Sequence, residues 1–392
     1  MKVLKYLFLA SITLVSCSKS DDYQSVQDYP NVKAAFGSKI DLDNLLNYQN
    51  QFIPSYITKD NSFVNPITNK GATLGRVLFY DNKLSSNNTI SCASCHQQAN
   101  AFSDVALASV GVNGTTGRHA MRLINSRFSN ESKFFWDERA ASLEAQTTQP
   151  IRNHGEMGYS GTNGDQSFSD LISKLSNIGY YKELFQYVYG SEEITESRMQ
   201  LALGQFIRSI QSFDSKYDVG RASANNDNQP FSNYTAQENT GKNLFLTAPV
   251  FDATGNRTSG GLGCAGCHAA PEFDIDPNTR NNGIIGSIGS NTLDLLNTRS
   301  PSLRDLVKVD GTTNGPMMHT GVITTLQAAI GHYGTINLAP GNTNLDPRLR
   351  PNGFGQQLHL TAPEVNAVIA FLRTLSGTAV YTDAKWENPF PN

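Results

Sequence analysis

The chain reads Cys92-Ala93-Ser94-Cys95-His96 in its first half and Cys264-Ala265-Gly266-Cys267-His268 in its second. Two cysteines three residues apart project from one helical turn, so their sulfurs can reach the vinyl groups of one porphyrin. The histidine that follows then lies under the ring and can coordinate iron. The pattern therefore predicts two covalently attached c-type haems, with His96 and His268 as iron ligands.

The competing interpretation of these cysteines is zinc, because two distant Cys-x-x-Cys pairs can form one Cys₄ site. Zinc would not require a histidine directly after both pairs, so the sequence favours haem. The chain has 5 cysteines. Four lie in the motifs and the fifth is Cys17, so none remains for a structural disulfide.

Length and composition limit the class of protein. A chain of 392 residues predicts two domains, at about 100–200 residues per domain. Hydrophobic residues make up 39%, below the usual value of about 45–50%, and Gly, Asn, Ser and Thr are plentiful. We therefore expect helices joined by long loops. The net charge of −3 gives no reason to propose nucleic-acid binding, which needs a basic face.

The N-terminus is typical of an export signal. Lys2 and Lys5 precede an apolar run, Tyr6 to Val15, that is too short to span a membrane. The run ends in Leu14-Val15-Ser16-Cys17, which resembles a bacterial lipobox. We expect residues 1–16 to be a lipoprotein signal peptide and Cys17 to carry a lipid anchor. Localisation would be periplasmic or on the outer membrane, including its outer face. An ordinary secretory signal is the alternative.

An internal repeat predicts the fold. Gly75-Arg76-Val77-Leu78-Phe79 precedes the first motif, and Gly241-Lys242-Asn243-Leu244-Phe245 precedes the second. Later, Phe206-Ile207-Arg208-Ser209-Ile210 corresponds to Phe371-Leu372-Arg373-Thr374-Leu375. Each half is thus a helix, a haem motif, a long insertion and a closing helix, the plan of class I cytochrome c. The prediction is a mainly α protein with two tandem cytochrome c-like domains. The expected segments are 17–67 (tether and N-terminal segment), 68–225, 235–377 and 378–392 (C-terminal tail).

The stretch Lys133-Phe134-Phe135-Trp136-Asp137-Glu138-Arg139-Ala140 resembles the bacterial dihaem cytochrome c peroxidases, a superfamily that includes MauG. The resemblance covers roughly residues 68 to 377. Other motifs match in order and spacing: Leu143-Glu144-Ala145-Gln146, Gly155-Glu156-Met157-Gly158, Thr298-Arg299-Ser300-Pro301-Ser302-Leu303-Arg304 and His319-Thr320-Gly321.

The resemblance makes the two haems unequal. It implies that the N-terminal haem, bound through Cys92, Cys95 and His96, reacts with peroxide beneath Gln146 and Glu156. A carboxylate can take a proton from one peroxide oxygen and deliver it to the other. An amide can hold the peroxide by hydrogen bonds without adding charge. Trp136 would carry electrons between the haems.

The resemblance implies an electron-transfer haem at Cys264, Cys267 and His268. The peroxidases have a Met as its sixth ligand, but counting from His319 the position is Tyr333, as in MauG-like members. A phenolate stabilises ferric iron and should lower the potential. His332, Met317 and Met318 are the competing ligands.

Two departures from the family pattern concern the first haem and a metal. Many members have a distal histidine near the position of Val112, where this chain has none. We therefore predict an open, five-coordinate haem that needs no reductive activation. The family also holds calcium through one Asn side chain and two backbone carbonyls. The two carbonyls map to Asn314 and Pro316. The Asn is His119 here, a soft ligand where calcium prefers oxygen, so this site is in doubt.

Three other histidines have separate expectations. His319 should lie near the haem interface without binding iron. His154, two residues from Glu156, is either an aid to proton delivery or a solvent-facing loop residue. His359 is expected on the surface.

The leading functional prediction is a peroxidase that reduces hydrogen peroxide to water. Its electrons would come from a small redox protein, a cytochrome c or a copper protein, through the C-terminal haem. The alternatives are a MauG-like oxidase that acts on a protein or another substrate, a non-catalytic dihaem electron carrier, and a peroxide sensor. Related enzymes are often dimers, so a homodimer is among the expected assemblies.

Overall fold

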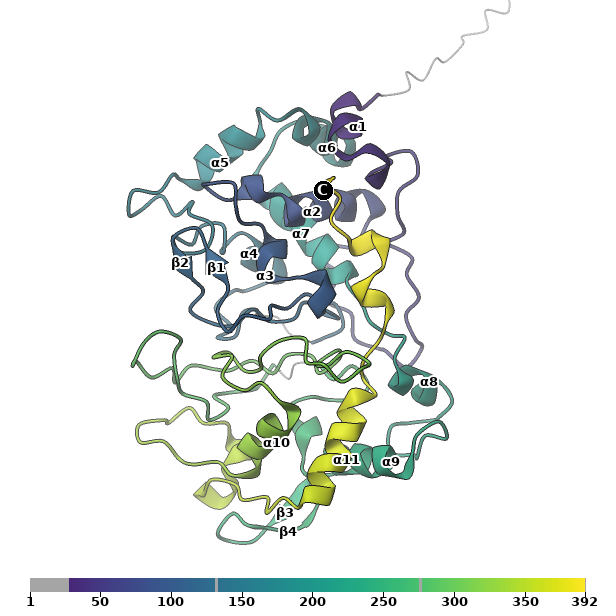
Figure 1. Ribbon diagram of the computed structural model, residues 1–392, viewed down its shortest axis with the longest axis vertical. Coiled ribbons are helices and arrows are strands. Elements are labelled where there is room, and N and C mark those ends of the chain that lie inside the picture. Colours follow the sequence, from purple (N-terminus) through teal and green to yellow (C-terminus); the bar gives the residue numbers. More distant parts are fainter. Residues whose placement is uncertain (1–27, 131–132, 275–276, 392) are drawn as a thin grey trace, which may run out of the picture.

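The computed structural model describes residues 28–391 apart from 131–132 and 275–276. The predicted signal peptide and Cys17 lie outside this range. Within it, no helix is long and apolar enough to cross a membrane. The chain is mainly helical with little sheet, as expected (Figure 1). The helices are α1 (Pro30–Phe36), α2 (Asn69–Tyr80), α3 (Cys92–Cys95), α4 (Leu143–Thr147), α5 (Phe168–Leu175), α6 (Gly179–Tyr189), α7 (Glu196–Ser209), α8 (Lys216–Ala222), α9 (Ala236–Leu246), α10 (Leu326–Gly334) and α11 (Ala362–Arg373). The strands form two antiparallel hairpins, β1 (Val110–Gly111) with β2 (Gly114–Thr115) and β3 (Pro249–Phe251) with β4 (Arg257–Gly260).

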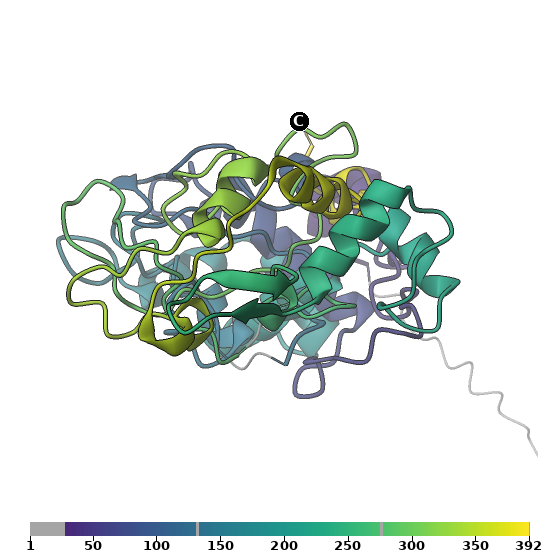
Figure 2. The ribbon, with the colours of Figure 1, turned by 90° about the horizontal axis from the view of Figure 1, so that it is seen from below.

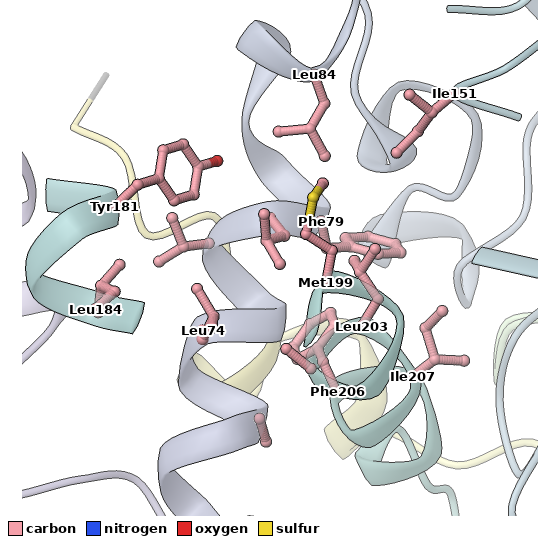
Figure 3. Packing of buried hydrophobic residues seen from close by; sticks show 14 of the residues in the cluster. Leu74, Phe79, Leu84, Ile151, Tyr181, Leu184, Met199, Leu203, Phe206 and Ile207 are labelled. Carbon is pink, nitrogen blue, oxygen red and sulfur yellow. The ribbon is translucent and has the colours of Figure 1, made fainter. Parts of the chain in front are cut away.

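The core of the first half forms where α2 packs along α7 (Figure 3). Thr68 caps α2 by accepting a hydrogen bond from the backbone N–H of Gly71 at 2.9 Å. Gly75 allows the close approach, because a Cβ there would lie 2.0 Å from the Ala202 carbonyl oxygen. The rings of Phe79 and Phe206 then meet, with centroids 5.1 Å apart. Burying each such ring stabilises the fold by about 1.5–3 kcal/mol.

The core of the second half repeats this arrangement with α9 and α11, which lie side by side in Figure 2. A Cβ on Gly241 would lie 1.9 Å from the Ala367 carbonyl oxygen, so glycine is again required at the crossing. The rings of Phe245 and Phe371 have centroids 5.2 Å apart. The two sequence repeats are therefore the two contact faces of the same helix pair.

The segments at the two ends of the described chain cover the first half. α1 and residues near it pack on the first core, and the C-terminus lies beside α2 (Figure 1). The Tyr48 hydroxyl donates to the carbonyl oxygen of Lys385 at 2.6 Å, and Arg76 Nε donates to that of Glu387 at 2.7 Å. Trp386 is buried between them. The last described residues therefore complete the core of the first half.

α8 belongs to the second core, although the predicted first domain runs to residue 225. The rings of Tyr217 on α8 and Phe273 meet edge to face, with centroids 4.8 Å apart. The core thus changes from one half to the other ahead of α8. The domain limits themselves remain predictions.

Candidate active site

A cavity of about 660 Å³ brings together the residues predicted for the first haem except Cys92, which lies at the start of α3 and is not among the lining residues. Cys95 and His96 reach it from the end of α3, Gln146 from α4, and Trp136 and Glu156 from loops. Pockets that hold ligands of cofactor size are usually about 300–1,000 Å³. The residues present therefore fit a porphyrin attached at this motif.

The His96 ring is held so that one nitrogen is left for a metal. Its Nδ1 lies 3.1 Å from the Phe102 carbonyl oxygen, to which it can donate a hydrogen bond. Burial lowers the pKa of His96, which keeps the imidazole neutral. A neutral ring whose Nδ1–H is engaged presents the Nε2 lone pair to a metal.

Gln146 and Glu156 enter the cavity from two separately stabilised turns. Ser142 caps α4 by accepting a hydrogen bond from the Ala145 N–H at 3.1 Å, which places Gln146 in the last turn. The side chain of Asn153 accepts hydrogen bonds from the N–H groups of Gly155 and Glu156, at 2.9 and 3.1 Å. This turn fixes the backbone from which the Glu156 carboxyl projects.

Burial raises the pKa of Glu156, and the positive charge of Arg139 partly opposes this shift. A carboxyl with a raised pKa gains and loses a proton closer to neutral pH than an exposed one does. That property suits a group that must first accept a proton and then return it.

Val112, the position near which the resemblance places the family's distal histidine, lies in the turn of the hairpin β1–β2. The N–H of Val112 donates to the Glu156 carbonyl oxygen at 3.0 Å. Among the described residues that line this cavity, the histidines are His96 and His119. His119 Nδ1 is directed to the Ala106 carbonyl oxygen at 3.0 Å. This geometry agrees with an open face over His96, while the coordination number itself stays a prediction.

A second cavity, of about 400 Å³, contains the residues predicted for the other haem. Cys264, Cys267 and His268 line it, together with Tyr333 on α10. His268 Nδ1 is buried and has no hydrogen-bond partner in the part of the chain that the structure describes. Burial lowers the pKa of His268 to about 4, so the ring is neutral as a metal ligand must be. These residues also fit a covalently attached porphyrin.

Tyr333 and its competitors differ in what holds them. The Asn282 side-chain amide donates to the Tyr333 hydroxyl at 3.4 Å and lies equally far from Met318 Sδ. Met317 and Met318 also line the cavity. His332, by contrast, is not a lining residue, and its Nε2 lies 2.9 Å from the Asn282 carbonyl oxygen. Asn282 therefore holds Tyr333 toward the cavity and His332 away from it.

Trp136 lies in the wall that the two cavities share. Its Nε1 donates to the His119 carbonyl oxygen at 2.8 Å, and its own carbonyl oxygen accepts from the Arg299 N–H at 2.8 Å. The His319 ring lies edge to face against it, with centroids 6.3 Å apart. The residues that line both cavities are His119, Ala120, Met121, Arg122, Trp136, Arg299 and Pro301.

The residues mapped to calcium have other partners. The Asn314 side-chain amide donates to the carbonyl oxygen of Asp305 at 2.8 Å and to the Tyr381 hydroxyl at 2.7 Å. Pro316 lines the second cavity. Nowhere in the described ranges do three His, Cys, Asp or Glu side chains converge as a metal-binding group. The prediction assigns calcium to the backbone carbonyls of Asn314 and Pro316, which this search does not cover, so the calcium site stays a prediction.

The other predicted histidines lie apart from the cavities. His154 is exposed, with its Nδ1 2.9 Å from the Asp165 carboxylate, and does not line the first cavity. His359 is exposed beside Asn256, as expected. His319 is buried beside Trp136, at the wall.

Sequence reasoning missed the polar residues that join distant segments around the site. Arg118 forms ion pairs with Asp137 at 2.6 Å and with Asp294 at 2.7 Å, which ties the first half to the second. Asn282 and Arg122 also lay outside every motif. Each is a common residue type in a loop, and only its contacts in space distinguish it.

A mainly helical chain in which two Cys-x-x-Cys-His segments each open onto a cavity is a c-type cytochrome with two haem sites. A profile of the family described as di-haem cytochrome c peroxidase matches residues 69–226. The methylamine utilization protein MauG of Methylophilus methylotrophus is 29% identical over 328 residues, 82% of this chain and 86% of that protein. The cytochrome c551 peroxidase of Nitrosomonas europaea is 28% identical over 319 residues, 78% of this chain and 80% of that protein.

Among solved structures, a MauG-like protein associated with microbial copper homeostasis superimposes with a TM-score of 0.65 at 26% identity. The match covers 87% of this chain and 99% of that one. Over most of its length the chain is thus similar to dihaem cytochrome c peroxidases and MauG proteins. This similarity implies an oxidoreductase with two c-type haems.

Proposed function

We propose that this protein is a peroxidase that reduces hydrogen peroxide to water at the first cavity. Electrons from a small redox protein enter at the second cavity. The observation that carries the proposal is the meeting of His96, Gln146 and Glu156 in one cavity that adjoins the other across Trp136. A haem bound at each motif would supply an iron centre that exchanges electrons and, at the first site, takes up the oxidant.

The chain's own residues handle the protons. Glu156 accepts a proton from the peroxide oxygen nearer to His96 and returns it to the outer oxygen, which leaves as water. The carboxyl can do both because burial raises its pKa. Gln146 donates an amide hydrogen bond that orients the peroxide without adding charge. A non-catalytic electron carrier would have no use for this pair beside an open face.

Trp136 gives the electrons a short path through the wall. Its indole is buried, lines both cavities and is held at Nε1 by the His119 carbonyl. Fixed aromatic rings between two redox centres shorten the gap that an electron must cross. The proposal is therefore that electrons enter at the haem site of His268 and are consumed at the haem site of His96.

We also propose that each half is a class I cytochrome c-like domain, over residues 68–225 and 235–377, with α8 at the end of the first range packed on the second core. The support is that in each half the helix before the motif packs on the closing helix, α2 on α7 and α9 on α11.

A MauG-like oxidase is the second candidate, and Tyr333 is the observation that favours it. Its hydroxyl faces the second cavity, where the peroxidases have a methionine. An anionic oxygen ligand would favour the oxidised states and so the withdrawal of electrons from a substrate.

One experiment separates these candidates. The purified haem-loaded protein is mixed with peroxide and then with a reduced cytochrome c or copper protein, while the spectra are followed. Rapid oxidation of the donor supports the peroxidase. An oxidised spectrum that persists in the presence of such donors supports the oxidase, and no response to peroxide leaves the electron carrier.

The variant Glu156→Gln tests the proton step. General acid–base catalysis is typically worth about 10²–10⁴ in rate, so kcat should fall by that factor while both haems remain attached. Glu192→Gln, at an exposed glutamate, is the matched control and should retain full activity. A fully active Glu156→Gln protein would contradict the assigned role.

A further inference from the structure

Arg122 occupies the wall between the two cavities and lines both of them. It lies on the long loop that follows the first haem motif in the chain. The corresponding loop of the second half contains Pro301 and Ser302. The Arg122 side chain crosses between the halves, since its Nη2 donates to the Ser302 carbonyl oxygen at 3.1 Å.

The charge of Arg122 has no anion among the described residues. Its Nε is buried and has no hydrogen-bond partner there, and no described carboxylate lies within ion-pair distance. Burial lowers the pKa of Arg122 to about 10, a shift that the more distant Asp305 opposes. A buried, unpaired cation is costly, and such groups are normally paired. The missing partner must therefore come from what fills the cavities.

Three of the other arginines that line the cavities form ion pairs within the protein. Arg118 is shared by Asp137 and Asp294, and Arg139 also pairs with Asp137. In the second cavity Arg348 pairs with Asp346 at 2.7 Å. Arg122 thus differs from these neighbours in carrying a charge that the chain does not neutralise.

The field of Arg122 reaches both sides of the wall. Its side chain lines the first cavity together with His96 and the second cavity together with His268. A fixed charge at this place acts on both sites at once.

We propose that Arg122 is a shared counter-charge for the two haems, pairing with the propionate carboxylates that reach the wall from both cavities. The inference rests on the proposed function only in placing one haem in each cavity. A positive charge near iron stabilises the reduced form, so Arg122 raises both reduction potentials together. Loss of this charge would therefore shift both potentials in the same direction.

The test is a spectroelectrochemical titration of the haem-loaded wild type and three variants. In Arg122→Gln both midpoint potentials should shift downward. Arg122→Lys keeps the charge and should restore both toward the wild-type values. Arg348→Gln, at a paired arginine that lines only the second cavity, should move at most the potential of that haem. A shift of one midpoint only in Arg122→Gln, or of neither, overturns the proposal. So does an Arg122→Lys protein that behaves like Arg122→Gln.

A measurement on the wild type keeps the proposal falsifiable where Arg122→Gln fails to load haem. Resonance Raman bending modes report whether haem propionates are hydrogen-bonded. Both haems should give the signature of a bonded carboxylate, and free carboxylates at either haem would contradict the inference. Failure of the proposed function looks different, since a protein with two haems that ignores peroxide still yields both potentials.

Discussion

Glu156 shows at the scale of single residues how position decides chemistry. The same side chain on the surface would have a pKa near 4.3 and would be a carboxylate at any physiological pH. In the turn stabilised by Asn153 it faces a cavity, and burial raises its pKa. The ten-residue interval to Gln146 was visible in the sequence, but the cause of the pKa shift was not.

The raised pKa of Glu156 predicts a pH-dependent effect on stability. Above its folded-state pKa the group is charged in both states, and burial penalises the folded one. Below about pH 4 it is neutral in both states and the penalty disappears. The free energy of unfolding is therefore higher at low pH, where Glu156 is protonated, and it falls as pH rises through the folded-state pKa of this residue. Glu156→Gln should raise the melting temperature at neutral pH but leave it unchanged at about pH 3. Calorimetry at both pH values checks this, and equal effects would contradict it.

Tyr333 predicts the potential of the second haem. On the proposal that Tyr333 is the sixth ligand, its replacement by methionine exchanges an anionic oxygen for a neutral sulfur, which favours ferrous iron. Tyr333→Met should therefore raise the midpoint potential of that haem and leave the other unchanged, as measured by spectroelectrochemistry. His332→Gln is the control and should leave the ferric spectrum unchanged, because His332 is directed to the Asn282 carbonyl. A changed spectrum in that control would make His332 the ligand.

At the scale of elements, the residues that repeat in the sequence are the ones that form the helix crossings. The Gly-x-x-Leu-Phe segments predicted two similar helices, and α2 and α9 bear this out. The capping box of Thr361 and Glu364 was also readable, because its hydrogen bonds are local. The pattern could not explain why each repeat begins with glycine. Glycine is needed because a backbone carbonyl of the partner helix, more than a hundred residues away in the chain, lies too close for a Cβ.

Gly75→Ala tests this crossing. The new Cβ would meet the Ala202 carbonyl oxygen at 2.0 Å, so the helices must separate. We expect a loss of about 1–3 kcal/mol in the free energy of unfolding, from denaturant titration followed by circular dichroism. Gly331→Ala on α10 is the matched control, because a Cβ there meets nothing within 4 Å. It should be neutral or stabilise by about 0.4–1 kcal/mol. Equal effects at the two positions would rule out the steric explanation.

At the scale of the whole molecule, polar bridges and the chain ends join the halves. Arg118, Arg122 and Asn282 connect loops that are remote in sequence, so no local spacing could have marked them. The same holds for residues 378–391, which were predicted only as a tail. Their contacts with α2 depend on a fold already formed, and a short apolar segment near a chain end gives no periodic signal.

Trp386→Ala measures how much this last segment contributes. Truncating a buried tryptophan typically costs about 3–5 kcal/mol, and this ring is buried against the first core. The first haem should lose its native spectrum at lower denaturant concentration than the second. Phe63→Ala is the control, since that ring is 82% exposed and its removal should change stability by less than about 0.5 kcal/mol. Simultaneous loss of both haem spectra would show that the segment supports the halves equally.

The return of the chain end to the first half has a consequence for synthesis. A nascent chain that stops before these residues still contains both haem motifs. It lacks Trp386 and the backbone carbonyls that anchor Tyr48 and Arg76. The half of the molecule that is translated first therefore depends on contacts from residues that are translated after the second half.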